Sequence, residues 1–136
     1  MMKRVIYIVL LITAPILTFG QVTSECDSIY NYADTMPQYS DGRSGLNKYL
    51  FDDLVQVFTE CYNRDSSLVT SIYMILTIDK FGSVINVVFS RTDVTEICQT
   101  ELKKKILTMK GWSPAEMNGK KVCCKYYWPI SCILWQ

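Results

Sequence analysis

The sequence predicts an α+β domain: a three-stranded antiparallel sheet with two helices packed on one face. Three observations predict it. Two short apolar runs flank the turn residues 79–83, a long alternating run follows Asn118 and Gly119, and two segments repeat apolar residues at helical spacing. Their order is helix, strand, strand, helix, strand. The last strand must therefore return beside the hairpin, with both helices covering the same face of the sheet.

The first twenty residues have the layout of a secretory signal peptide. Lys3 and Arg4 precede an apolar stretch at residues 5–19, and the small residue Gly20 stands before Gln21. The stretch is short for a membrane span, which needs about 20 apolar residues. We therefore expect an exported, periplasmic protein, with an uncleaved inner-membrane anchor as the alternative. Residues 21–35 then form a flexible N-terminal arm, and residues 36–136 form one domain.

The charge balance excludes some classes of partner. The chain has fourteen Lys and Arg residues and thirteen Asp and Glu residues, and removal of Lys3 and Arg4 with the signal leaves twelve against thirteen. Without a basic excess, nucleic acid binding has no electrostatic support. The chain also has no histidine, nucleophile elbow or phosphate-binding glycine loop, so we expect no enzyme and no cofactor.

The first three elements follow from local patterns. Leu46, Leu50 and Leu54 repeat at helical spacing, and the polar residues 61–67 indicate a loop after this helix. Residues 72–78 and 84–90 have the character of strands. The turn between them predicts a hairpin, with Gly82 at positive φ.

The second helix and the last strand follow. A helix beginning at Asp93 places one apolar stripe toward the core, and Gly111 ends it. Trp112 and Pro114 then form a corner that closes the core, and Asn118 and Gly119 form a tight turn. Alternate residues of the following run are apolar and predict its core face: Val122, Cys124, Tyr126, Trp128, Ile130, Cys132 and Leu134.

This last strand is expected to lie at an edge of the sheet. Pro129 cannot donate to a ladder, so it belongs at an edge or a bulge. At about 3.3 Å per residue the strand spans roughly 43 Å, against roughly 23 Å for a seven-residue neighbour. We therefore expect part of its backbone to have no partner within the domain.

Six cysteines behind an export signal predict disulfides. Cys26 with Cys61 is the most natural pair, because both are expected in loops. Two of Cys98, Cys124 and Cys132 could link helix to sheet, or remain as buried apolar residues. Cys123 points away from the core and is the best candidate for a free thiol. No C-x-x-C spacing occurs, so we expect neither a zinc site nor a thioredoxin-type pair.

At this point the residues resemble the TonB C-terminal domain family of Gram-negative envelope proteins. The resemblance covers residues 36–134 and rests on three motifs at family-like spacing: Met36-Pro37-x-Tyr39, Ile78-Asp79-Lys80-x-Gly82-x-Val84, and Met109-x-x-Trp112-x-Pro114-Ala115-x-x-Asn118-Gly119-Lys120-x-Val122, followed by Tyr126 and Pro129-Ile130. The resemblance implies the same sheet with two helices. It also implies binding of a segment of an outer-membrane transporter beside the last strand.

The physical interpretation of that strand agrees with the family's mode of binding. Main-chain hydrogen bonds would supply most of the affinity, and outward side chains the selectivity. The outward set is Cys123, Lys125, Tyr127, Pro129, Ser131 and Ile133. Complete transducers of the family also carry a membrane helix with a histidine motif and a Pro-rich spacer, which this sequence lacks. Force transmission from the inner membrane is therefore not expected.

Three hypotheses follow for function. The first is a non-enzymatic periplasmic module, involved in TonB-type transmembrane transport, that captures a peptide by strand addition. The second is an envelope protein with thiol chemistry at Cys123. The third is a structural domain that forms a homodimer through the same exposed edge.

Overall fold

A computed structural model describes residues 26–65 and 71–131 of the chain. It confirms the α+β class, but the predicted three-stranded antiparallel sheet is wrong. The sheet is mixed and has five strands: four follow the order β1-β7-β3-β4, and β6 pairs with β7. A separate two-stranded ribbon joins β2 (Gln38–Tyr39) to β5 (Trp112–Ser113). The predicted signal segment, Cys132 and Ile133 lie outside the described residues.

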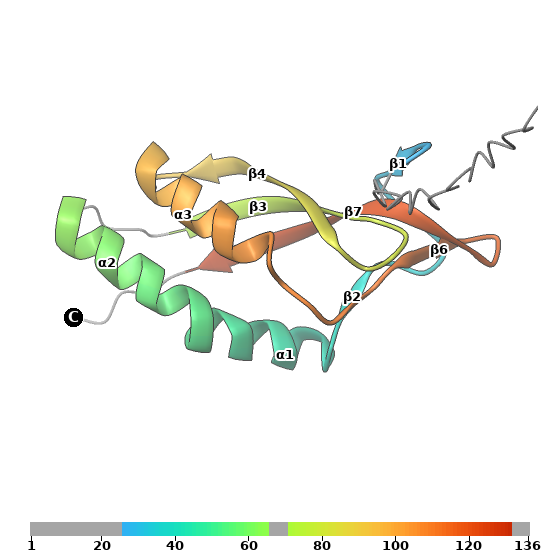
Figure 1. The fold of residues 1–136 in the computed structure, drawn as a ribbon, viewed down its shortest axis with the longest axis horizontal. Coiled ribbons are helices and arrows are strands. Elements are labelled where there is room, and N and C mark those ends of the chain that lie inside the picture. The colour runs from blue at the N-terminus through green and yellow to red at the C-terminus, as the bar shows by residue number, and fades with distance from the viewer. Residues whose placement is uncertain (1–25, 66–70, 132–136) are drawn as a thin grey trace, which may run out of the picture.

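The helices lie over one side of the sheet, as Figure 1 shows. Helix α1 (Gly42–Tyr49), a π-helical turn η1 (Leu50–Leu54) and α2 (Val55–Asp65) form one continuous run. Helix α3 (Glu96–Ile106) follows the central hairpin. The loop predicted from residue 61 is wrong over residues 61–65, because the helix continues to Asp65. Cys61 is buried against α3, whereas the polar Asn63 and Arg64 lie on the exposed side.

The core lies between these helices and one face of the sheet. Alternate residues of β3 (Ser71–Ile78) point into it, as a half-buried strand requires. The larger buried side chains come from both layers: Leu46, Leu54, Phe58, Ile72, Met74, Leu76, Ile78, Leu102, Ile106, Trp128 and Ile130. The opposite face of the sheet carries Tyr73, Val88 and Tyr127, each between two-fifths and one-half exposed.

The hairpin of β3 and β4 (Val84–Thr92) has the predicted turn. Gly82 adopts a φ of 81°. The buried carboxylate of Asp79 accepts hydrogen bonds from the backbone N–H groups of Phe81 and Ser83, at 2.9 and 2.8 Å. The ladder between the two strands contains two register shifts, between Tyr73 and Met74 and between Thr77 and Ile78.

The predicted turn before the last strand is also confirmed. Strands β6 (Ala115–Met117) and β7 (Lys120–Ser131) are joined by Asn118 and Gly119, whose φ values are 51° and 76°. Strand β7 is longer than β3, as expected, but the expectation that its extra length lacks partners is wrong. The excess lies at its start, where β6 pairs with residues 120–122 and β1 (Ile29–Tyr30) runs parallel to residues 123–124.

Residues 26–35, expected as a flexible arm, are held against this hairpin. Cys26 is bonded to Cys123, and Ile29 and Tyr30 pair with β7. The carboxylate of Asp34 accepts a hydrogen bond from the Asn118 N–H at 2.9 Å, and Thr35 forms a bridge with Glu116. A two-residue strand has no periodicity to reveal it in a sequence, so β1 and the parallel pairing could not be anticipated.

None of the helices in residues 26–65 and 71–131 has the length and hydrophobicity of a membrane span.

Candidate functional site

The most distinctive feature of the molecule is one side of β7. Along residues 124–131 this strand pairs with β3 on one side. On its other side, β1 occupies only residues 123–124. Within the described part of the chain, residues 125–131 therefore have a strand on one side and none on the other. We call this stretch the open edge.

The main-chain groups along the open edge can be assigned to a side. The hydroxyl of Ser90 on β4 donates a hydrogen bond to the Tyr73 carbonyl at 3.2 Å, so this carbonyl points toward β4 and away from β7. Pro129 stands opposite Tyr73 in the ladder. Because neighbouring residues of a strand alternate in direction, Pro129 and Tyr127 present their main-chain groups to the open edge. The missing N–H of Pro129 thus costs no bond to β3.

A groove runs along the open edge. It has a volume of about 550 Å³ and lies between the first turns of α1 and the second half of β7. Arg43, Leu46 and Asn47 line its helical side; residues 126–129 and Ser131 line its strand side. The Arg43 side chain is exposed, and no carboxylate of the described residues forms an ion pair with it. The groove therefore offers an extended chain both main-chain partners and a cationic wall.

Aromatic side chains support the strand side of this groove from below. Tyr126 stacks edge-on against Trp112 at 4.8 Å between ring centroids, and Trp128 lies 6.5 Å from the ring of Tyr49. Trp112 also meets Tyr39 at 5.3 Å. Trp112 is buried, and its indole N–H has no hydrogen-bond partner in the described structure. This cluster connects β7 to α1 through Tyr49 and to β5 through Trp112.

The predicted partner-binding residues fall into three groups. Tyr127, Pro129 and Ser131 are exposed on the open edge, and Lys125 is half-buried at its start. Cys123 is not available there, because it is buried and bonded to Cys26 under β1. Ile133 is outside the described residues. Of the predicted structural motif, Trp112 is buried, Pro114 is half-buried between β5 and β6, and Asn118 and Gly119 form the turn.

The sequence did not predict that Arg43, Leu46 and Asn47 would form the helical side of a groove. The helical pattern shows which face of α1 is apolar. It does not show which strand that face lies beside, and no local signal in these residues could have revealed it.

The predicted disulfide partners are wrong, although disulfides are present. Cys26 bonds to Cys123 and Cys61 to Cys98, with Cα atoms 5.9 Å apart in each pair. The pairing of Cys26 with Cys61 fails because Cys61 is helical and faces α3. Cys123 is therefore not a free thiol, and Cys98 links helix to helix instead of helix to sheet. The alternation of apolar residues predicts which face of a strand a cysteine occupies. It does not predict which segment of the chain packs on that face.

Cys124 is the free cysteine of the described residues, and it is fully buried on the core face of β7. Burial raises the pKa of its thiol, and a hydrogen bond with the Lys125 backbone only partly opposes this. The neutral thiol therefore predominates, and the group behaves as a small apolar side chain.

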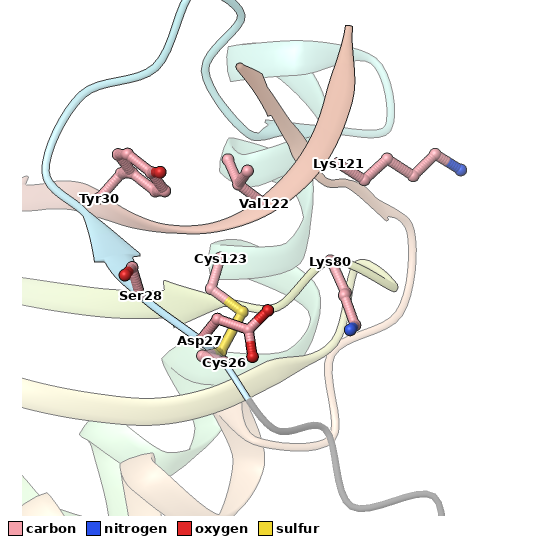
Figure 2. A pocket seen from close by; sticks show the side chains of 8 residues that line it. All are labelled: Cys26, Asp27, Ser28, Tyr30, Lys80, Lys121, Val122 and Cys123. Carbon is pink, nitrogen blue, oxygen red and sulfur yellow. A yellow bond between two sulfur atoms is a disulfide. The ribbon is translucent and has the colours of Figure 1, made fainter. Parts of the chain in front are cut away.

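A second, smaller hollow of about 130 Å³ lies beside the Cys26–Cys123 disulfide. Figure 2 shows Asp27 near the two bonded sulfur atoms; Lys80 and Tyr30 line the same hollow. Among the described residues, no cluster of Cys, Asp or Glu side chains is arranged to hold a metal ion.

Comparison with known protein families, with characterised proteins and with solved structures gave no match. The two disulfides are compatible with an exported protein.

Proposed function

We propose that this protein is a non-enzymatic module of the bacterial periplasm that binds an extended peptide segment by strand addition to the open edge of β7. The observation that carries the proposal is the set of main-chain groups at residues 125, 127, 129 and 131 that face away from β3, together with the groove beside them. An added strand would pair with β7 on the side opposite β3. Main-chain bonds supply the affinity in this mode, and pockets for alternate side chains supply the selectivity.

The other outer strand of the sheet, β4, is a poorer site. Two register shifts interrupt its ladder with β3, and such bulges twist an edge away from regular pairing. The ladder of β7 with β3 has none over eight consecutive pairs. The described residues also place a groove beside β7, between that strand and α1.

The partner we propose is a segment of an outer-membrane transporter, on the basis of the resemblance to the TonB C-terminal domain. The lining of the groove favours a peptide that carries an acidic residue within reach of Arg43 and other side chains that contact Tyr127. Thiol chemistry at Cys123 is not proposed, because its sulfur is bonded to Cys26.

Replacement of a main-chain donor tests strand addition. In Tyr127→Pro the lost N–H is one that faces the open edge, so the β3–β7 ladder keeps its bonds. Peptides selected from a random library on the wild-type protein should bind Tyr127→Pro about fivefold more weakly, because one main-chain hydrogen bond to the peptide is worth about 1 kcal/mol. Thermal melting checks that the variant is folded.

The matched control is Tyr127→Ala, which removes the same side chain and keeps the N–H. A second control places a photoreactive residue at position 125 or at position 88 on β4, where Val88 is about as exposed as Tyr127. The selected peptides should be captured from position 125 and not from position 88. Equal binding by the proline and alanine variants would reject the edge mechanism.

A further inference from the structure

We infer that the Cys26–Cys123 disulfide is a redox latch: it holds β1 on β7 and thereby sets how much of that strand's edge a partner can reach. The inference rests on the proposed function, because it concerns regulation of the same edge. In the oxidised protein β1 covers Cys123 and Cys124, and the open edge begins at Lys125.

Strand β1 is weakly held apart from this bond. Its ladder with β7 consists of two residue pairs, and Ile29 and Tyr30 are 48% and 38% exposed, so neither buries much apolar surface. The next anchors along the chain are Asp34 and Thr35, which contact the β6–β7 hairpin. A two-residue ladder does not offset the conformational entropy lost in ordering residues 27–33. The disulfide holds β1 in place by keeping it at a high effective concentration beside β7.

The two disulfides differ in accessibility. Cys26 is only partly buried and lines the hollow of about 130 Å³ that is seen in Figure 2. Cys61 and Cys98 are 1% and 0% exposed, between α2 and α3. A reductant in solution therefore reaches the Cys26 sulfur first. The neighbouring Cys124 does not scramble this bond, because its thiol is buried on the opposite face of β7 and largely protonated.

The opening step is a thiol–disulfide exchange with a dithiol reductant. A thiolate of the reductant attacks the Cys26 sulfur, the Cys26–Cys123 bond breaks, and Cys123 leaves as a thiolate that takes up a proton. The second thiol of the reductant then displaces Cys26 from the mixed disulfide. The protein gains two electrons and two protons as two thiols, and the reductant becomes a disulfide.

Release of β1 after reduction lengthens the open edge at its N-terminal end. Cys123 has the same parity as Tyr127, so its main-chain groups also face the side from which β1 departs. Once β1 leaves, the edge runs from residue 123 to residue 131. The reduced protein accepts a longer strand than the oxidised protein.

The first test is hydrogen–deuterium exchange of the oxidised wild-type protein and of Cys26→Ser. The amides of residues 27–31 should exchange at least tenfold faster in the variant. The matched control is Cys61→Ser combined with Cys98→Ser, which removes the other disulfide and should leave exchange at residues 27–31 unchanged. Unchanged protection in Cys26→Ser would overturn the inference, because β1 would then stay in place by itself.

If Cys26→Ser does not fold, stepwise reduction of the wild-type protein replaces it. With increasing dithiothreitol and alkylation, Cys26 and Cys123 should be modified before Cys61 and Cys98 are. The reverse order overturns the latch. The same series provides the reduced protein for the exchange measurement.

The second test uses a labelled synthetic peptide with the sequence of residues 27–32 as the probe for the vacated position. It should bind Cys26→Ser or the reduced protein at least tenfold more tightly than the oxidised protein. Equal binding overturns regulation by the latch, even if the library peptides still distinguish Tyr127→Pro from Tyr127→Ala. A failure of strand addition itself would give a different result. The library peptides would then bind Tyr127→Pro and Tyr127→Ala equally well, in the oxidised and in the reduced protein.

Discussion

Tyr49 shows how a single side chain joins the helices to the sheet. Its hydroxyl donates a hydrogen bond to the Lys105 carbonyl at the end of α3, at 3.1 Å. Its ring contacts Tyr39 on β2 and Trp128 on β7. Burial, with smaller contributions from the negative charge of Asp53 and from Tyr39, raises the pKa of this phenol. The neutral form is thus strongly favoured in the folded protein.

This shift predicts alkaline sensitivity. The folded pKa of Tyr49 lies above the unfolded value of about 10, so its stabilising effect is complete below pH 10 and is lost as the pH rises further. Tyr49→Phe should lower the free energy of unfolding by about 1 kcal/mol at pH 8, through the lost hydrogen bond. Above pH 10 the variant should then lose stability less steeply than the wild type.

Urea denaturation between pH 8 and pH 11 measures this difference. Tyr32→Phe is the control, because Tyr32 is 78% exposed and should leave the alkaline slope unchanged. Parallel slopes for wild type and Tyr49→Phe would contradict the assignment to Tyr49.

Among the strands and turns, the two glycine turns have different reasons for their glycines. A Cβ at Gly82 would collide with the backbone carbonyl of Trp112, so the β3–β4 turn packs directly on β5. A Cβ at Gly119 meets nothing within 4 Å, although φ is positive at both positions. Glycine is therefore required at position 82 for the positive φ and for the close approach of Trp112. At position 119 it is required for the positive φ alone.

The two alanine variants should separate these contributions. Gly119→Ala should cost about 1 kcal/mol for the strained φ. Gly82→Ala should cost about 2–4 kcal/mol, because the turn and β5 must also move apart. Chemical denaturation of both variants gives the comparison, and equal losses would show that the contact with Trp112 relaxes without cost.

These turns also show which parts of the fold the sequence could predict. The hairpin with Gly82, the turn at Asn118 and Gly119, and the core face of β7 over residues 124–130 follow from local signals, and all three agree with the structure. Strand β1 is too short to have a pattern. The disulfide partners and the groove beside α1 depend on which segments pack together, and residue spacing carries no information about that.

In the molecule as a whole, the Cys61–Cys98 disulfide is the main covalent support of the helical layer. It joins α2 to α3 across 37 residues of chain and is fully buried. Closing a loop of that length restricts the unfolded chain, which stabilises the folded state by about 3–4 kcal/mol. The Arg64 guanidinium lies beside the bond and pairs with Glu101 at 3.3 Å.

Cys61→Ala combined with Cys98→Ala should therefore lower the free energy of unfolding by about 3–4 kcal/mol. Urea denaturation under non-reducing conditions, with the wild type in parallel, measures the loss. A decrease below about 1 kcal/mol would mean that packing between α2 and α3, and not the crosslink, sets the stability of this layer.

The central position of β7 has a consequence for how the protein forms. Strands β1, β3 and β6 all pair with β7, so no continuous sheet exists before residues 120–131 have been synthesised. The β3–β7 partners are 46 to 60 residues apart in the chain and the β1–β7 partners 94 residues apart, and such distant pairings slow folding. Until then the apolar faces of β3 and β4 remain exposed, and exposed apolar strands of an incomplete sheet favour aggregation.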